Sequence, residues 1–133
     1  MKRILLSLAV VVGIVASFIL FLPKQPAKEA STEQLTFATI ESNIENGAKL
    51  YDVRTAEEYK TSHFKGAINW SLQDMEAGTL PDIAKSTKIY VYCRSGNRSA
   101  QATTILKQAG FDYVTDLGGL GAVEAIGGEL AAR

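Results

Sequence analysis

The stretch "KIYVYCRSGNRSAQATTILKQAG", residues 88–110, contains the three features that decide the fold. It begins with an apolar run that is typical of a buried strand, continues with a short polar loop, and ends with a long helical pattern. The only cysteine of the chain, Cys93, lies where the strand meets the loop. A strand that leads through a loop into a helix is the repeating unit of α/β proteins.

The same alternation continues on both sides of this stretch. Three further strands are predicted at 50–53, 66–70 and 113–117, and helices at 37–47, 55–64 and 71–78, besides the one at 98–110. Residues 119–130 predict a loop with a weak helix. Thr55 and Ser71 are the predicted N-caps, and Gly47 and Gly110 the predicted helix stops. Strands and helices at this spacing predict a parallel sheet that is covered on both faces.

Two groups of reactive side chains follow predicted strands. Asp52 and Arg54 stand at the end of the strand at 50–53, and Cys93 follows the apolar run at 89–92. Because ligands bind beyond the carboxyl ends of parallel strands, we expect these side chains to lie at one edge of the sheet.

The loop after Cys93 has the composition of an anion site. It leads into a helix, whose free N–H groups stabilise negative charge, and Gly96 permits the backbone to turn those groups toward one point. Arg94 and Arg98 add positive charge. These features predict that the Cys93 pKa falls from about 8.5, the value for a free thiol, toward or below neutrality, and hence a nucleophilic thiolate. The alternative is a small buried hydrophobic residue.

Three segments resemble the single-domain rhodaneses, which are sulfurtransferases: "YDVRTAEEYKTSHFKGAINW" (51–70), "VYCRSGNRSAQATTILKQAGF" (91–111) and "VTDLGGL" (114–120). The resemblance extends over residues 40–123. With the N-terminal segment described below, the sequence is most similar to the exported phage-shock-type members. The resemblance implies a three-layer α/β/α fold with a five-stranded parallel sheet over residues 35–133.

The same resemblance implies the chemistry. Cys93 would attack the outer sulfur of a donor such as thiosulfate, carry it as a persulfide, and give it to cyanide or to a thiol. Asp52, Arg54 and Gly119 would have supporting roles. The residues that would bind the substrate are those of the loop: Arg94, Ser95, Gly96, Asn97 and Arg98. No metal and no cofactor is implied. We expect Arg54 to pair with Glu58, and His63 to serve the fold.

Four other functions use a comparable cysteine. A cysteine phosphatase or an arsenate reductase needs a Cys-x5-Arg loop, whereas Arg98 is only the fifth residue after Cys93. A papain-type protease differs in the order and spacing of its cysteine and histidine. A sulfur-carrier module that receives persulfide from a partner protein shares the loop, so the sequence leaves this alternative open.

Composition excludes several classes of protein. One cysteine and one histidine cannot supply the four ligands of a structural zinc site, and a single cysteine forms no intramolecular disulfide. From residue 31 onward ten Lys and Arg stand against thirteen Asp and Glu, so no basic stripe for nucleic acid is expected. The sequence gives no indication of the oligomeric state.

The N-terminus differs from the rest of the chain. After the basic head Met1-Lys2-Arg3, nineteen residues at 4–22 carry no charge, and as a helix they would span nearly 30 Å. We expect residues 1–22 to be an uncleaved membrane anchor, with a cleaved signal sequence and a buried helix as alternatives. Residues 23–34 predict a linker. The charge bias predicts export, with the domain periplasmic or anchored on the periplasmic side of the inner membrane.

Overall fold

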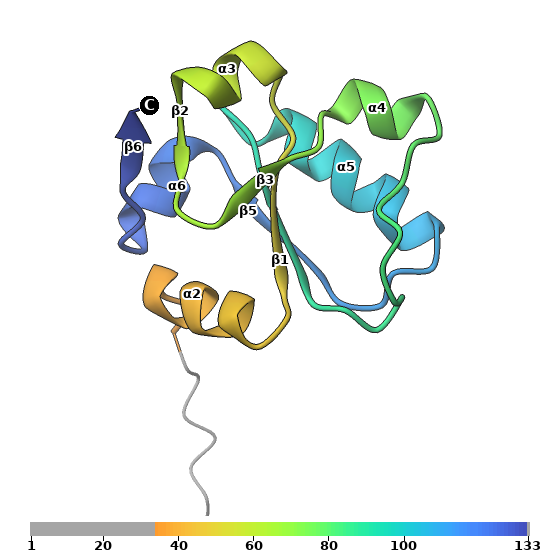
Figure 1. Cartoon of the computed structure of the whole chain (residues 1–133), viewed down its shortest axis with the longest axis horizontal. Helices are drawn as coiled ribbons and strands as arrows, with labels where there is room; N and C mark the ends of the chain where they lie inside the picture. Colours follow the sequence, from red (N-terminus) through yellow and green to blue (C-terminus); the bar gives the residue numbers. More distant parts are fainter. Residues whose placement is uncertain (1–33, 133) are drawn as a thin grey trace, which may run out of the picture. The chain divides into compact units, whose positions relative to one another are not determined.

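The structure is a computed structural model that describes residues 34–132 (Figure 1). The expected anchor or signal sequence at 1–22, and all of the expected linker except Gln34, lie outside these residues. Between residues 34 and 132, no helix is both long enough and apolar enough to cross a bilayer.

Helices and strands alternate along the described residues, as the sequence predicts. The elements are, in chain order, α2 (Phe37–Glu45), β1 (Lys49–Asp52), α3 (Ala56–Thr61), β2 (Ser62–Phe64), β3 (Ala67–Asn69), α4 (Leu72–Glu76), β4 (Ile89–Tyr92), α5 (Asn97–Gln108), β5 (Val114–Gly118), α6 (Leu120–Ala125) and β6 (Leu130–Ala132). The predicted N-caps are confirmed, since the hydroxyl groups of Thr55 and Ser71 accept hydrogen bonds from the first turns of α3 and α4.

Four parallel strands form the main sheet in the order β3-β1-β4-β5. The predicted α/β fold is therefore confirmed, and these four strands are the ones that the sequence pattern indicates. The resemblance implied five strands. Among the described residues, β2 instead pairs antiparallel with β6 in a separate two-stranded sheet. The helix predicted at 55–64 accordingly ends at Thr61, because the chain from Ser62 onward is extended to pair with β6.

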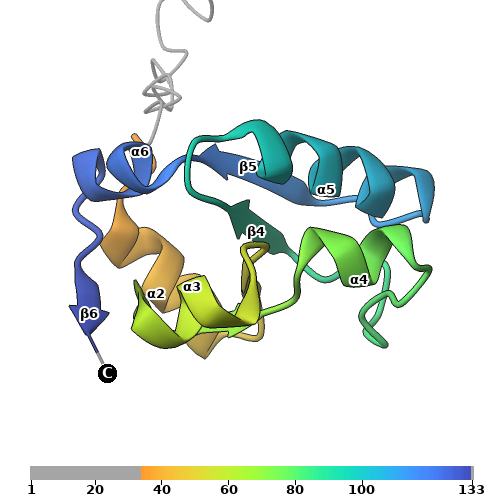
Figure 2. The same ribbon diagram turned by 90° about the horizontal axis from the view of Figure 1, so that it is seen from above.

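Helices cover both faces of the sheet (Figure 2). All four residues of β4 are buried, and their side chains alternate between two hydrophobic clusters. Ile89 and Val91 join residues of α4 and α5 on one face. Tyr90 and Tyr92 join residues of α2 and α6 on the other face. A strand that is apolar on both faces is typical of the centre of a parallel sheet.

The strand ends meet at one edge of the sheet, as expected. Asp52 at the end of β1 stands opposite Tyr92 at the end of β4, and Tyr92 stands opposite Gly118 at the end of β5. The register between β4 and β5 shifts at this point, so that β5 has one extra residue, Leu117. Cys93 follows directly after Tyr92, and this edge therefore holds the candidate site.

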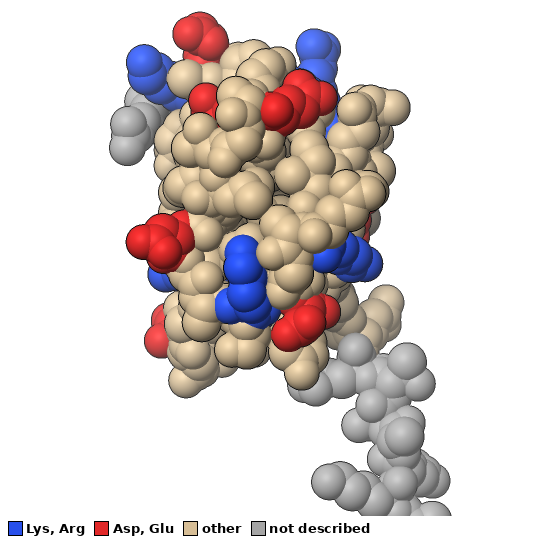
Figure 3. Space-filling model, turned by 90° about the vertical axis from the view of Figure 1, so that its right-hand side faces the viewer, with Lys and Arg blue, Asp and Glu red and all other residues tan. Residues whose placement is uncertain are grey.

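Charged side chains are scattered on the face that Figure 3 shows. Basic and acidic side chains are separated there by uncharged surface, so this face has no continuous basic stripe. The positive charge that bears on the candidate site comes from the loop between β4 and α5.

Candidate active site

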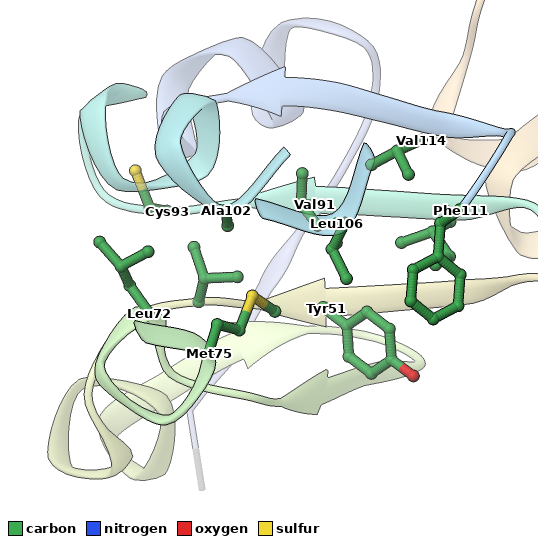
Figure 4. Close-up of a cluster of buried hydrophobic side chains, with 11 residues drawn as sticks. Tyr51, Leu72, Met75, Val91, Cys93, Ala102, Leu106, Phe111 and Val114 are labelled. Atoms are coloured by element: carbon green, nitrogen blue, oxygen red, sulfur yellow. The ribbon is translucent and has the colours of Figure 1, made fainter. Parts of the chain in front are cut away.

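Cys93 lies at the junction of β4 and α5, and its side chain continues the alternation of β4. It is on the same face of the sheet as Ile89 and Val91, and it is fully buried. Figure 4 shows that its sulfur points away from the packed side chains of the cluster, toward the turn that leads into α5. The sulfur thus faces the loop, although Cys93 as a residue is part of the buried hydrophobic cluster.

The loop turns back on the sulfur because of Gly96. This residue has φ +97°, a conformation that side chains disfavour, and it stands at the N-cap of α5 without a capping side chain. The Gly96 N–H group donates to Cys93 Sγ over 3.0 Å. The Cys93 thiol donates to Ser99 Oγ over 3.7 Å. Donors that a Ser, Thr or Asp cap would otherwise occupy are therefore free to face the sulfur.

These contacts lower the pKa of the Cys93 thiol from its ordinary value. Burial is the largest single influence and favours the neutral thiol, but the hydrogen bonds that Ser99, Gly96 and Ser95 direct at the sulfur together outweigh it. The direction of the predicted shift is thus confirmed, and its causes are the contacts with Ser99, Gly96 and Ser95 rather than the arginines.

A second segment, Gly118 to Leu120, holds the loop in place through backbone hydrogen bonds. The Cys93 N–H group donates to the Gly118 carbonyl over 3.0 Å, and the Leu120 N–H group donates to the Arg94 carbonyl over 3.2 Å. Gly119 lies so close to the loop that a Cβ atom there would be 2.8 Å from the Arg94 carbonyl oxygen. The chain can pass at this distance only with glycine at 119.

The two arginines of the loop have different surroundings. Arg94 is exposed and takes part in no ion pair among residues 34–132. Arg98, already in the first turn of α5, donates from Nη1 to Glu58 Oε2 over 2.7 Å and from Nη2 to Glu58 Oε1 over 2.9 Å. The expected pairing of Glu58 with Arg54 is therefore wrong, because Glu58 pairs with Arg98 instead.

Arg54 has a partner of its own, which is buried. Its guanidinium donates to both oxygens of Asp52, with a shortest distance of 2.6 Å, and to the Ser62 carbonyl over 2.6 Å. The Tyr92 hydroxyl donates to Asp52 Oδ2 over 2.7 Å. Burial and then the Asp52 charge raise the pKa of Tyr92, so this hydroxyl keeps its proton. Asp52 and Arg54 thus join the ends of β1 and β4 to the start of β2.

The other residues singled out from the sequence lie around the loop or apart from it. Ser95 is exposed and forms an isolated antiparallel bridge with Gly119. Asn97 is exposed, and its Oδ1 accepts from Gln101 Nε2 over 2.7 Å. His63 stacks on the ring of Tyr59, with 4.0 Å between the ring centroids, which agrees with a role in the fold.

A pocket of about 210 Å³ opens beside the loop. Its lining consists of residues from the segment after β1, from α3 and β2, from the loop and from α6: Arg54, Glu58, Thr61, Ser62, Arg94 and Leu120. Cys93 itself is fully buried and is not among the lining residues. Among residues 34–132, no three His, Cys, Asp or Glu side chains are grouped so that they could hold a metal ion.

Comparison with known proteins identifies the family of this fold and loop. Residues 36–125 match the family described as the Rhodanese-like domain. The chain belongs to the rhodanese family. The resemblance found in the sequence is thereby confirmed.

Similar rhodaneses include both characterised enzymes and solved structures. The thiosulfate sulfurtransferase PspE of Escherichia coli (strain K12) is 40% identical over 72 residues, which cover 52% of this chain and 67% of that protein. The crystal structure of the Alr3790 protein from Anabaena sp. aligns with a TM-score of 0.61 at 32% identity, covering 74% of this chain and 80% of that one. A structure of rhodanese with anions from E. coli aligns with a TM-score of 0.52 at 32% identity, covering 65% and 99%.

Two features of this rhodanese site were missed in the sequence. The buried Ser99 hydroxyl contacts the sulfur and also donates to the Gly96 carbonyl over 3.0 Å. Glu58, which lies 40 residues before Arg98, holds its guanidinium. Ser99 could have been found from its position directly after the loop, in the first turn of the helix. The partner of Arg98 has no local signal in the sequence, because it depends on where the fold places α3.

Proposed function

We propose that this rhodanese is a sulfurtransferase that moves sulfur through a persulfide on Cys93. The donor is thiosulfate or a similar small anion, and the acceptor is cyanide or a thiol. The single observation that carries the proposal is the ring of donors from Ser95, Gly96 and Ser99 around the Cys93 sulfur. The similar E. coli thiosulfate sulfurtransferase supports this donor, and the similar E. coli rhodanese, whose structure holds anions, supports an anionic one.

In the first step the Cys93 thiolate attacks the outer sulfur of thiosulfate. A new sulfur–sulfur bond forms on Cys93, the sulfur–sulfur bond of thiosulfate breaks, and its electron pair leaves with sulfite. The product is a persulfide anion. The N–H groups of Gly96 and Ser95, which face the sulfur before the reaction, stabilise the charge that remains on the loop.

In the second step the acceptor attacks the outer sulfur of the persulfide. Cyanide leaves as thiocyanate, or a thiolate leaves as a new persulfide, and the electron pair of the broken bond restores the Cys93 thiolate. No oxidant, reductant or cofactor is required. Because hydrogen bonds to the sulfur lower the pKa of the Cys93 thiol, the thiolate forms more readily, and the proposed reaction uses no neighbouring general base.

The loop residues have distinct roles in this proposal. Arg94, exposed at the pocket, attracts the anionic donor, while Ser95, Gly96 and Asn97 shape the loop. Arg98 links the loop to α3 through Glu58. Asp52, Arg54 and Gly119 act in support: the first two through their buried ion pair, and Gly119 through its close approach to the Arg94 carbonyl.

Other uses of the loop are less well supported. A phosphatase needs the arginine that closes its loop to hold the bound oxyanion, but here both terminal nitrogens of Arg98 are occupied by Glu58. A carrier that accepts sulfur only from a partner protein remains the second candidate. The fully buried sulfur favours a small donor, because a small anion needs less opening of the loop than the cysteine of a folded protein does.

We also propose where the protein works. The basic head and the uncharged run at residues 4–22 support an N-terminal membrane anchor or signal sequence, and hence export of the domain at residues 35–133. In a bacterium this places the domain in the periplasm, free or tethered to the inner membrane through a linker at residues 23–34.

Measuring thiocyanate formation from thiosulfate and cyanide tests the function. We expect saturable turnover by the purified protein and none by the Cys93→Ser variant. A parallel assay supplies a persulfidated protein as the donor. Transfer from the protein donor without any transfer from thiosulfate would contradict the enzyme proposal and support the carrier.

A further inference from the structure

The two arginines of the active loop are not equivalent partners for an anion. Arg98 is bound to Glu58 through two hydrogen bonds, and the two side chains are only 25% and 27% exposed. In a bidentate arginine–carboxylate pair of this kind, the N–H groups of the guanidinium point at the carboxylate and its charge is balanced by the carboxylate. Arg94, by contrast, is exposed and has no acidic partner in the described part of the chain.

Glu58 is itself anchored, so it cannot readily follow Arg98 toward a ligand. Its Oε2 atom accepts from the Thr55 N–H group over 3.1 Å, and its own N–H group donates to the Thr55 hydroxyl over 3.3 Å. These reciprocal bonds form the capping box at the start of α3. The carboxylate therefore has three donors that converge on it, and two of them come from Arg98.

The pocket beside the loop reflects this difference. Glu58 and Arg94 both line it, and Arg98 is not among its lining residues. Arg54 also lines the pocket, but its charge is balanced by Asp52 at 2.6 Å. An anion that enters the pocket thus meets one cation without an acidic partner, Arg94, and the edge of the Glu58 carboxylate.

From these contacts we propose that Glu58 is a positioning residue that holds Arg98 out of the pocket and leaves Arg94 as the cation that attracts the anionic donor. This inference rests on the proposed sulfur transfer, because it assigns a specificity role at the same site. Of the two arginines near the loop, Arg94 and Arg98, only Arg94 then sets the preference of the site for anions. Removal of the Glu58 charge should release Arg98 and increase that preference.

The comparison of two alkylating reagents tests this assignment without sulfur transfer. Iodoacetamide is neutral, iodoacetate is an anion, and both react with the thiolate of the only cysteine in the chain. A change in the thiol pKa alters both rates alike, so the ratio of the iodoacetate rate to the iodoacetamide rate reports the positive charge near the sulfur. A merely structural change in α3 would not raise this ratio selectively.

We expect Glu58→Gln, in the full-length chain in a non-ionic detergent, to raise the ratio about three- to tenfold and to keep α3 capped, because Gln also completes a capping box. Glu57→Gln is the matched control. Glu57 is an exposed carboxylate in the same turn with no contact to Arg98, so its loss should change the ratio less than about twofold. The double variant Glu58→Gln/Arg98→Gln should return the ratio to the wild-type value or below.

Two results would overturn the role of Glu58: an unchanged ratio in Glu58→Gln, or an increase that persists in the double variant. Thiocyanate formation, measured on the same samples, separates this inference from the proposed function. The expected ratios without any sulfur transfer would contradict the function and support the positioning role. A Cys93 that neither reagent modifies would instead contradict the nucleophilic thiolate on which both proposals depend.

Discussion

Cys93 is held through its side chain and its backbone by residues that are far apart in the sequence. The turn at Gly96 supplies an N–H donor at 3.0 Å, and the segment at Gly118 accepts the Cys93 N–H group at 3.0 Å. The position of the sulfur is therefore sensitive to atoms that never contact a substrate. A single methyl group added where another segment packs against the loop should therefore displace the loop.

Gly119→Ala should damage the site. Its φ of −89° suits any residue, so space and not conformation is decisive: the new Cβ would lie 2.8 Å from the Arg94 carbonyl oxygen and 3.1 Å from Ser95 Cα. Both are backbone atoms, so the loop must shift. We expect a loss of about 1–3 kcal/mol in the free energy of unfolding and more than a tenfold loss of kcat/KM. Urea denaturation and the thiocyanate assay measure the two effects.

Gly121→Ala provides the control for this variant. Gly121 lies two residues further on, inside α6, where a Cβ would have no neighbour within 4 Å. Alanine there should leave activity intact and stabilise the helix by about 0.5–1 kcal/mol. Equal activity in the two variants would contradict the close approach at Gly119.

At the scale of the elements, the site depends on links between strands and helices that the main sheet does not itself provide. The buried cluster of Asp52, Arg54 and Tyr92 connects the ends of β1 and β4 to β2. The pair of Glu58 with Arg98 connects α3 to α5. Each link places a short element against the edge at which Cys93 lies.

Asp52→Asn should destabilise the fold strongly. It leaves the buried Arg54 guanidinium without its counter-charge, which costs about 3–5 kcal/mol in the free energy of unfolding. Glu41→Gln breaks an ion pair with Lys65, whose side chain is 83% exposed, and should therefore change the free energy of unfolding far less. Urea denaturation of both variants tests the comparison. Similar losses in the free energy of unfolding would show that the Asp52–Arg54 pair stabilises the fold no more than the exposed pair does.

The link between α3 and α5 should weaken in acid. The hydrogen bond from Arg98 is the main cause that lowers the pKa of Glu58, to about 2. Because the folded-state pKa lies below the unfolded value, near 4.3, the carboxylate stabilises the fold above that value, and this stabilisation is lost as the pH falls toward 2. The difference in unfolding free energy between wild type and Glu58→Gln should therefore be largest above pH 5 and should shrink toward pH 2. Urea denaturation over a pH series measures it, and a constant difference would contradict the pairing.

Across the whole molecule, the sequence predicted the repeating parts of the fold well. The four strands of the main sheet and the helices between them follow from apolar runs, caps and glycine stops, which are local signals. The location of Cys93 at the carboxyl edge of the sheet followed from the same pattern. Much of the loop chemistry could be predicted because Ser95 and Gly96 follow Cys93 closely in the chain.

The parts that could not be predicted depend on distant partners. The pairing of β2 with β6 joins segments more than 60 residues apart, and β2 is too short to show a strand pattern of its own. Similarly, the sequence did not show which arginine pairs with Glu58. In the structure Arg98 pairs with Glu58 and Arg54 pairs with Asp52, and this choice depends on where the fold places α3. Such choices are tertiary and leave no periodic trace in the sequence.

A chain that begins at Gln34 should fold and keep its activity. Both hydrophobic clusters and every element that forms the site lie between residues 35 and 132. We expect the melting temperature to stay within a few degrees of the full-length value, and only the full-length protein to sediment with membranes. Calorimetry and co-sedimentation with vesicles measure these properties. Failure of the shorter chain to fold would contradict the domain boundary, and its sedimentation with membranes would contradict the anchor.

The persulfide on Cys93 is the central claim, and mass spectrometry of the intact protein after incubation with thiosulfate tests it most directly. We predict that the protein gains the mass of one sulfur atom, that cyanide removes this mass, and that Cys93→Ser never acquires it. If the wild-type protein gains no sulfur under conditions in which iodoacetamide alkylates Cys93, the thiol is reactive but is not a sulfurtransferase nucleophile toward thiosulfate, and the proposed chemistry of the site is wrong.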